Sequence, residues 1–119
     1  MNSQTSESRL QVVTIPVLQQ WKTGGCPTAM RTAYDAVTAR IADTAADIIL
    51  VGDSVGNVCL GVDDTLPVGM AMMNHHLEAT SRTRPRALVV ADMPLLRFHL
   101  SLDETIRNAN DFLQRVPAP

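Results

Sequence analysis

Two apolar runs in the sequence each lead into an aspartate, and these aspartates are the side chains best suited to chemistry. The run at 48–51 is Ile-Ile-Leu-Val and continues through a glycine into Asp53 and Ser54. The run at 87–91 is Ala-Leu-Val-Val-Ala and continues into Asp92. Short unbroken apolar runs are typical of strands that are buried on both faces of a parallel sheet. A carboxylate that follows such a strand lies at the edge where α/β folds build their sites.

Asp53 and Asp92 are 39 residues apart, which leaves room for one loop, one helix and a return to the sheet. The spacing therefore predicts two carboxylates at the same end of adjacent parallel strands, with Gly52 letting the backbone turn there. Two hard oxygen ligands suit Mg²⁺, which usually takes one or two protein carboxylates together with substrate oxygens and water. The alternative from spacing alone is that each aspartate caps the turn or helix that follows it.

The composition excludes several classes of protein. The 119 residues fit one domain, and 10 basic against 12 acidic side chains leave a net charge of −2. The chain therefore lacks the excess of basic side chains by which proteins bind nucleic acid or an anionic membrane. It also has no apolar stretch that approaches the length of a membrane span. Cys26 and Cys59 match no metal or redox spacing, so we interpret them as reduced thiols of an intracellular protein.

Hydrophobic periodicity and turn signals give the order of the elements that must position the two aspartates. Residues 1–11 are expected to form a mobile tail. The expected elements are then a helix from Thr14 to the glycines at 24–25, a strand at 28–32, a helix at 34–45, the strand at 48–51, a long loop at 55–67, a helix at 70–82, the strand at 87–91 and a helix at 102–115. This alternation is typical of parallel strands joined by helical crossovers.

Several local interpretations accompany this order. Thr14 is expected to cap the first helix and Trp21 to pack as a plug beside Val17 and Leu18. A buried stripe is expected on the 34–45 helix at Tyr34, Val37, Ile41 and Ala45. The loop at 55–67 is expected to lie over the Asp53 edge, as long loops often serve as lids or binding loops. Ser101 and Glu104 have the spacing of a capping box.

Other polar residues have both a functional and a structural interpretation. Arg31 could pair with an anionic substrate, but a snorkelling or poorly fitting side chain is the favoured interpretation. The adjacent His75 and His76 point about 100° apart on a helix, so they cannot share one metal and are interpreted as surface or interface histidines. The basic residues before the last strand are interpreted as a solvated loop: Arg82, Arg84 and Arg86.

A series of ordered motifs from about residue 12 to residue 115 resembles one known family. The motifs are Thr-Ile-Pro at 14–16, Thr-Ala-Tyr-Asp at 32–35, Thr-Ala-Arg-Ile-Ala-Asp at 38–43, Ile-Leu-Val-Gly-Asp-Ser at 49–54, Leu-Gly at 60–61, Asp-Thr-Leu-Pro at 64–67, His76, Arg-Ala-Leu-Val-Val-Ala-Asp-Met-Pro at 86–94 and Arg-Asn-Ala at 107–109. The chain is thus similar to ketopantoate hydroxymethyltransferase, also called 3-methyl-2-oxobutanoate hydroxymethyltransferase.

This resemblance implies a (β/α)₈ TIM-type barrel enzyme of pantothenate biosynthesis, of which the chain would form about three βα units and a leading helix. The enzyme would transfer a hydroxymethyl group from 5,10-methylenetetrahydrofolate to 3-methyl-2-oxobutanoate, a 2-oxoacid, giving 2-dehydropantoate. By position, Asp53 and Asp92 match the Mg²⁺ ligands, and Asp53, Ser54 and Asp92 match contacts to the 2-oxoacid. The resemblance further implies a homo-oligomer, in the cytoplasm or, in a eukaryote, in mitochondria.

The sequence also departs from the family pattern. The Lys-x-Glu-Gly-Gly strand and the catalytic glutamate of the family have no counterpart, so residues 12–119 are expected to be a barrel domain truncated after its third βα unit, with no catalytic base. The turn at 45–47 is one residue shorter than usual, and Arg31 replaces an apolar residue. An alternative function is therefore a non-catalytic remnant that at most binds Mg²⁺ or associates with intact subunits. A lyase acting on 2-oxoacids with Mg²⁺ is a third class.

Overall fold

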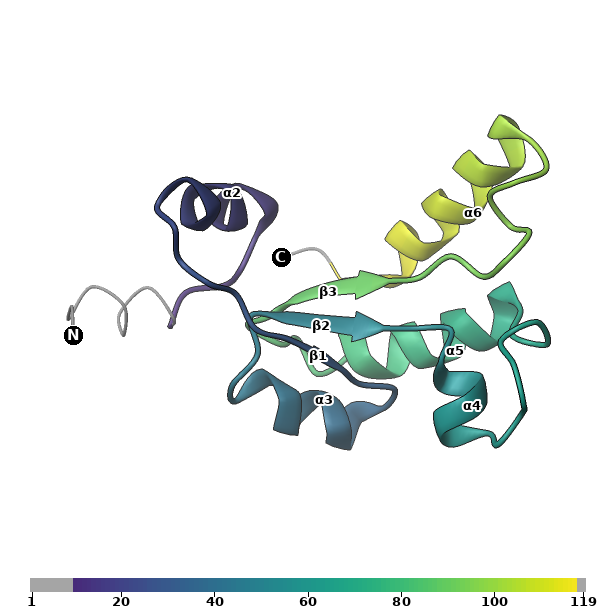
Figure 1. Cartoon of the computed structure of the whole chain (residues 1–119), viewed down its shortest axis with the longest axis horizontal. Helices are drawn as coiled ribbons and strands as arrows, with labels where there is room; N and C mark the ends of the chain where they lie inside the picture. Colours follow the sequence, from purple (N-terminus) through teal and green to yellow (C-terminus); the bar gives the residue numbers. More distant parts are fainter. Residues whose placement is uncertain (1–9, 118–119) are drawn as a thin grey trace.

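The computed structural model describes residues 10–117, so most of the tail expected at 1–11 lies outside the described residues. Strands and helices alternate along the chain as the sequence predicts (Figure 1). The elements are α2 (Ile15–Thr23), β1 (Met30–Thr32), α3 (Ala36–Asp43), β2 (Ile48–Val51), α4 (Val55–Cys59), α5 (Met70–Ser81), β3 (Leu88–Ala91) and α6 (Leu102–Arg115).

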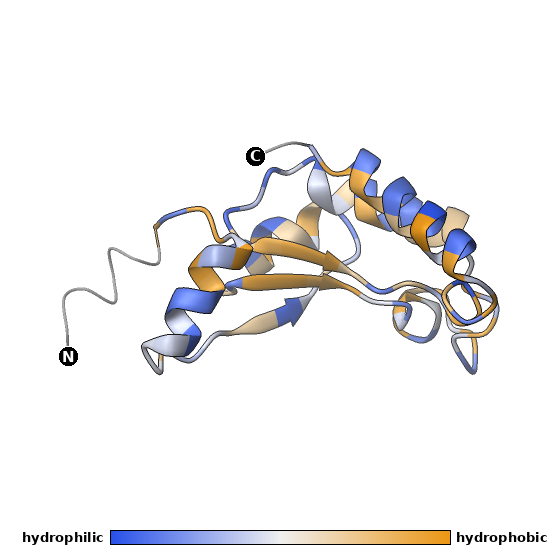
Figure 2. Cartoon of the chain, turned by 90° about the horizontal axis from the view of Figure 1, so that it is seen from above, coloured by the Kyte–Doolittle hydropathy of each residue, from blue (hydrophilic) through white to orange (hydrophobic). Residues whose placement is uncertain are grey.

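The three strands form one parallel sheet in the order β1-β2-β3, which confirms the predicted parallel arrangement. Ile48 of β2 is in register with Met30 of β1 and with Leu88 of β3. β2 and β3 are apolar along their length, whereas β1 carries a hydrophilic segment (Figure 2) because Arg31 interrupts it. Because the strands are parallel, their carboxyl ends all lie at the same edge of the sheet.

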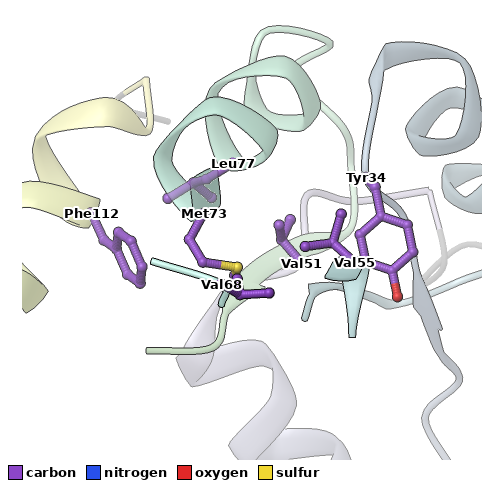
Figure 3. Close-up of a cluster of buried hydrophobic side chains, with 7 residues drawn as sticks. All are labelled: Tyr34, Val51, Val55, Val68, Met73, Leu77 and Phe112. Carbon is purple, nitrogen blue, oxygen red and sulfur yellow. The ribbon is translucent and has the colours of Figure 1, made fainter. Parts of the chain in front are cut away.

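Helices α3 and α5 cover one face of this sheet (Figure 1). Ile49 and Val51 of β2 point into that layer and are fully buried. Around Val51 the main hydrophobic cluster gathers residues from β2, α4, α5, α6 and the connecting segments (Figure 3): Tyr34, Val51, Val55, Val68, Met73, Leu77 and Phe112. This cluster lies beneath the carboxyl end of β2, so the packing that stabilises the fold also supports the residues that follow β2.

Helix α3 differs from its prediction in its bounds and in its buried side. Asp35 caps the helix, accepting from the Thr38 N–H at 2.7 Å, so the helix begins at Ala36. These Thr38 N–H and hydroxyl hydrogen bonds lower the pKa of the Asp35 carboxyl. The predicted stripe is wrong at Val37 and Ile41, which are 64% and 66% exposed, and at Ala45, which is also exposed. Ala39 is buried against Ile49 instead, because its small side chain lets the helix approach the sheet closely.

Two interpretations of α2 are also wrong. The Thr14 side chain makes no capping hydrogen bond, although a proline does lie in the first turn of the helix as predicted. Trp21 is only half-buried and none of the α2 residues is buried, so it is not a packing plug. The reason is that α2 stands apart from the sheet (Figure 1), so its apolar residues Val17, Leu18 and Trp21 are only partly covered.

Carboxylates join the strands at the opposite, amino-terminal edge of the sheet. Asp43 accepts hydrogen bonds from the backbone N–H groups of Arg86 at 3.0 Å and Ala87 at 2.7 Å. Asp47 is buried, accepts from the Ala29 N–H at 3.0 Å and lies 3.6 Å from the Arg86 guanidinium. Arg86 is therefore half-buried and structural, which corrects its interpretation as part of a solvated loop.

Helix α6 packs on α5, and Phe112 is its one buried residue. Ser101 accepts from the Glu104 N–H at 3.1 Å, which confirms it as the cap, but within residues 10–117 the Glu104 side chain makes no return hydrogen bond, so only half of the predicted capping box forms. Arg115 bonds both to Asp111 of its own helix and to Glu78 of α5, which joins the two helices. None of the helices within residues 10–117 is long and apolar enough to cross a membrane.

Candidate active site

Asp53 and Asp92 follow the neighbouring strands β2 and β3 directly, at the carboxyl-terminal edge of the sheet. The Asp92 N–H donates to the Val51 carbonyl at 3.0 Å, and the Asp53 N–H donates to Oδ2 of Asp92 at 3.3 Å. Both aspartates are half-buried, so their carboxylates keep access to solvent. The predicted placement at one edge of adjacent strands is thus confirmed, and the Asp92 carboxylate ties the two loops together.

Gly52 makes room for this arrangement. A Cβ atom at this buried residue would lie 3.0 Å from Oγ of Ser54 and 3.2 Å from Oδ2 of Asp92. Positive φ angles among the described glycines occur at Gly25 and Gly61, so Gly52 does not turn the backbone through the left-handed region. The glycine is needed because a side chain would occupy the space of two candidate site residues.

Tyr34 joins the site from the segment between β1 and α3, although the sequence pattern placed it only on a helical stripe. Its hydroxyl lies 2.7 Å from Oγ of Ser54. Nδ1 of His76 donates to the Tyr34 carbonyl at 2.7 Å, since a carbonyl can only accept, so this histidine joins α5 to the segment after β1. A signal was present in the sequence, because Tyr34 follows the first strand just as Asp53 and Asp92 follow the other two.

The sequence predicts a loop for the whole segment 55–67, but this segment begins with the short helix α4. Val55 is buried in the main cluster, and a Cβ at Gly56 would lie 2.7 Å from Val68 and 2.9 Å from Val62. The chain beyond α4 therefore folds tightly back over this helix. Its predicted position is confirmed, because α4 and the following turn lie beyond the carboxyl end of β2 (Figure 1).

The donors at this edge fit a magnesium ion better than a softer metal. No group of three or more His, Cys, Asp and Glu side chains that could hold a metal occurs within residues 10–117. The half-buried carboxylates of Asp53 and Asp92 are hard oxygen donors, and Mg²⁺ commonly takes one or two of these with water and substrate oxygens. The residues present therefore fit the ion that the resemblance implies.

Comparisons with known proteins agree with the motif resemblance. The family model described as ketopantoate hydroxymethyltransferase matches residues 12–118. The chain is 69% identical over 113 residues to 3-methyl-2-oxobutanoate hydroxymethyltransferase 2 of Bradyrhizobium diazoefficiens, covering 95% of this chain and 39% of that protein. It is 67% identical to 3-methyl-2-oxobutanoate hydroxymethyltransferase of a Methylobacterium species, covering 88% of this chain and 37% of that protein.

A more distant relative, 3-methyl-2-oxobutanoate hydroxymethyltransferase of a Geobacillus species, is 47% identical over 77% of the chain and 33% of its own length. The chain thus spans less than two-fifths of the length of these relatives. The match nevertheless covers all the elements that carry Asp53, Ser54 and Asp92. The chain belongs to the ketopantoate hydroxymethyltransferase family.

Proposed function

We propose that this chain supplies the Mg²⁺-binding and 2-oxoacid-binding part of a 3-methyl-2-oxobutanoate hydroxymethyltransferase. That enzyme would transfer a hydroxymethyl group from 5,10-methylenetetrahydrofolate to 3-methyl-2-oxobutanoate and give 2-dehydropantoate for pantothenate biosynthesis. The observation that carries the proposal is the hydrogen bond from the Asp53 N–H to Oδ2 of Asp92, which holds the Asp92 carboxylate against the Asp53 backbone where the adjacent strands β2 and β3 end. Membership of the family supports the choice of reaction.

Each residue at the edge has a distinct task in this proposal. Asp53 and Asp92 hold Mg²⁺, and Ser54 donates a hydrogen bond to the carboxylate of the 2-oxoacid. Gly52 leaves the space in which these side chains converge. When bound, Mg²⁺ withdraws charge from the keto oxygen of a chelated 2-oxoacid and makes the proton on C3 easier to remove.

Removal of that proton needs a base within hydrogen-bond reach, and the described residues offer no strong candidate. Asp63 and Asp64 beyond α4 are both exposed, and Glu78 is engaged by Arg82 and Arg115. We therefore propose that the base comes from a part of the enzyme outside residues 10–117. The chain alone is expected not to catalyse the transfer, since losing a positioned base typically costs about 10²–10⁴ in rate.

The wider architecture forms part of the same proposal. Three parallel strands with helices on one face suit the first units of a (β/α)₈ barrel, and among residues 10–117 no strand pairs with the outer edge of β3, where a fourth strand could pair. Cys26 and Cys59 are exposed free thiols and the relatives are bacterial, which favours the cytoplasm as the place of action.

A second candidate function is association with a longer subunit of the same family. The sheet face opposite α3 and α5 leaves Val90 37% exposed and Met30 53% exposed, an unusual state for a parallel sheet. Light scattering of the chain mixed with the Bradyrhizobium relative separates this function from the first. A stable mixed complex is expected if the exposed face is an interface, and two independent species would contradict it.

Calorimetric titration with 3-methyl-2-oxobutanoate, with and without Mg²⁺, tests the main proposal. We expect binding that depends on Mg²⁺ and is weakened at least tenfold by Asp92→Ala, since a charged ligand is lost. Asp63→Ala is the matched control, because it removes an exposed carboxylate from the segment after α4. Equal binding by both variants would contradict the assigned roles.

A further inference from the structure

We propose that Tyr34 is a positioning residue, which fixes the Ser54 hydroxyl so that it donates to the carboxylate of the 2-oxoacid. The inference rests on the proposed function, because it assigns Ser54 the 2-oxoacid as its acceptor. It goes further in giving a role to a residue that follows β1, the strand that leads to neither aspartate. The evidence is one short hydrogen bond and the way Tyr34 itself is held.

The 2.7 Å distance between the Tyr34 and Ser54 hydroxyl oxygens fits a hydrogen bond in either direction. A phenol is the stronger acid of the two hydroxyls, with an ordinary pKa of about 10, and is therefore the better donor. If Tyr34 donates to Ser54, the single Ser54 proton is free to point at an anion. The two hydroxyls then form a chain of two hydrogen bonds, from Tyr34 to Ser54 and from Ser54 to a carboxylate oxygen of the ligand.

Tyr34 is held more rigidly than a surface tyrosine would be. Its ring is buried in the main cluster beside Val55 (Figure 3), with the hydroxyl at the outer end of the ring. On the backbone, the Tyr34 N–H donates to Oγ1 of Thr38 at 3.2 Å, and the Tyr34 carbonyl accepts from Nδ1 of His76 at 2.7 Å. Helices α3 and α5 thus both fix the residue that in turn fixes Ser54.

Ser54 needs such a partner because its own position does not determine its rotamer. It is half-buried and its side chain makes no capping hydrogen bond to α4, so three staggered χ1 rotamers compete. If only one of three equally populated rotamers is competent, the apparent affinity falls about threefold. That factor is the size of effect expected when the Tyr34 hydroxyl is removed.

The first test measures the rotamer directly. In NMR spectra of the chain, the three-bond Hα–Hβ couplings of Ser54 report whether χ1 is fixed or averaged. We expect one rotamer in the unsubstituted chain and averaged couplings in Tyr34→Phe, which keeps the ring packing. The control is Thr44→Val, which removes a hydroxyl donating to the Ile41 carbonyl at 2.7 Å at the other edge of the sheet. Unchanged Ser54 couplings in Tyr34→Phe would overturn the proposal.

The second test measures the consequence for the ligand, by titrating 3-methyl-2-oxobutanoate in the presence of Mg²⁺. We expect Tyr34→Phe to raise Kd about threefold, and Ser54→Ala to raise it roughly tenfold or more, since it removes a hydrogen bond to a charged group. The double variant should match Ser54→Ala alone, because Tyr34 acts only through Ser54. Additive losses would show instead that Tyr34 contacts the ligand itself and is not a positioning residue.

The two tests separate this inference from the proposed function. Failure of the unsubstituted chain to bind the 2-oxoacid with Mg²⁺ would contradict the proposed function, and the couplings would still support or overturn the fixing of Ser54 by Tyr34. Averaged couplings together with unchanged affinity in Tyr34→Phe would show that the rotamer is irrelevant to the ligand, which overturns the inference while the proposed function stands.

Discussion

Replacing Gly52 by alanine should damage the candidate site far more than the fold. The added Cβ would lie 3.0 Å from Oγ of Ser54 and 3.2 Å from Oδ2 of Asp92, whereas ordinary contacts begin at 3.4 Å. Relief of these contacts requires movements of about 0.4 Å and 0.2 Å, or a change of rotamer, and both atoms belong to candidate site residues. The perturbation therefore falls on Ser54 and Asp92.

The magnitudes follow from these contacts. Overpacking typically costs about 1–3 kcal/mol, but a Gly→Ala change at a φ that alanine accepts returns about 0.4–1 kcal/mol through the unfolded state. Because the crowded atoms are the ends of half-exposed side chains, we expect the free energy of unfolding to fall by no more than ~2 kcal/mol. Displacing groups around a metal site typically costs roughly 10- to 100-fold in affinity, so binding should suffer much more.

Gly69→Ala is the matched control, because a Cβ there would meet nothing within 4 Å and its φ of −105° is accessible to alanine. Urea unfolding followed by circular dichroism gives the stability of both variants, and calorimetric titration with Mg²⁺ and 3-methyl-2-oxobutanoate gives their affinity. Affinity of Gly52→Ala equal to that of Gly69→Ala would refute the argument that Gly52 makes space for the site.

Three further predictions concern stability. Asp43→Ala should lower the free energy of unfolding by about 2–3 kcal/mol in urea titrations, because two backbone N–H groups lose a carboxylate partner, while the exposed Asp63→Ala should change it by less than ~0.5 kcal/mol. Because the pKa of Asp35 is lowered in the folded state, its stabilisation is complete above about pH 4 and is lost as the pH falls through that pKa. The free energy of unfolding of Asp35→Asn should therefore change less between pH 7 and pH 3 than that of the original chain. Parallel changes in the two proteins would contradict this. Phe112→Ala should lower the free energy of unfolding by about 3 kcal/mol and speed amide hydrogen exchange throughout α6. If the faster exchange were confined to the ends of α6, Phe112 would not be the residue that holds this helix on α5.

The parts of the fold that could be predicted are those set by local pattern. The apolar runs at β2 and β3 are short and unbroken, and the interval between Asp53 and Asp92 has the length of one crossover, so parallel neighbours and a shared edge follow. The cap at Ser101 depends on residues three apart and was predicted for the same reason.

The parts that could not be predicted depend on contacts between distant segments. Val37 and Ile41 have helical spacing, but which side of α3 is buried depends on how closely Ala39 lets it approach β2. Arg86 has the pattern of a loop residue, and only the fold places Asp47, from the turn before β2, beside it. The contact of Tyr34 with Ser54, and the space that Gly52 leaves for Ser54 and Asp92, depend on how the three strand ends pack together.

The central claim is that the edge formed by Asp53 and Asp92 binds a hard divalent cation. Mn²⁺ is a paramagnetic substitute for Mg²⁺ that broadens the NMR signals of nuclei close to it. Titration of the ¹⁵N-labelled chain with Mn²⁺ should first broaden the amide signals of Asp53, Ser54 and Asp92, and excess Mg²⁺ should restore them. Asp53→Asn combined with Asp92→Asn should abolish that selectivity. Broadening centred on the exposed acidic residues of α6, or equally selective broadening in the double variant, would contradict the claim.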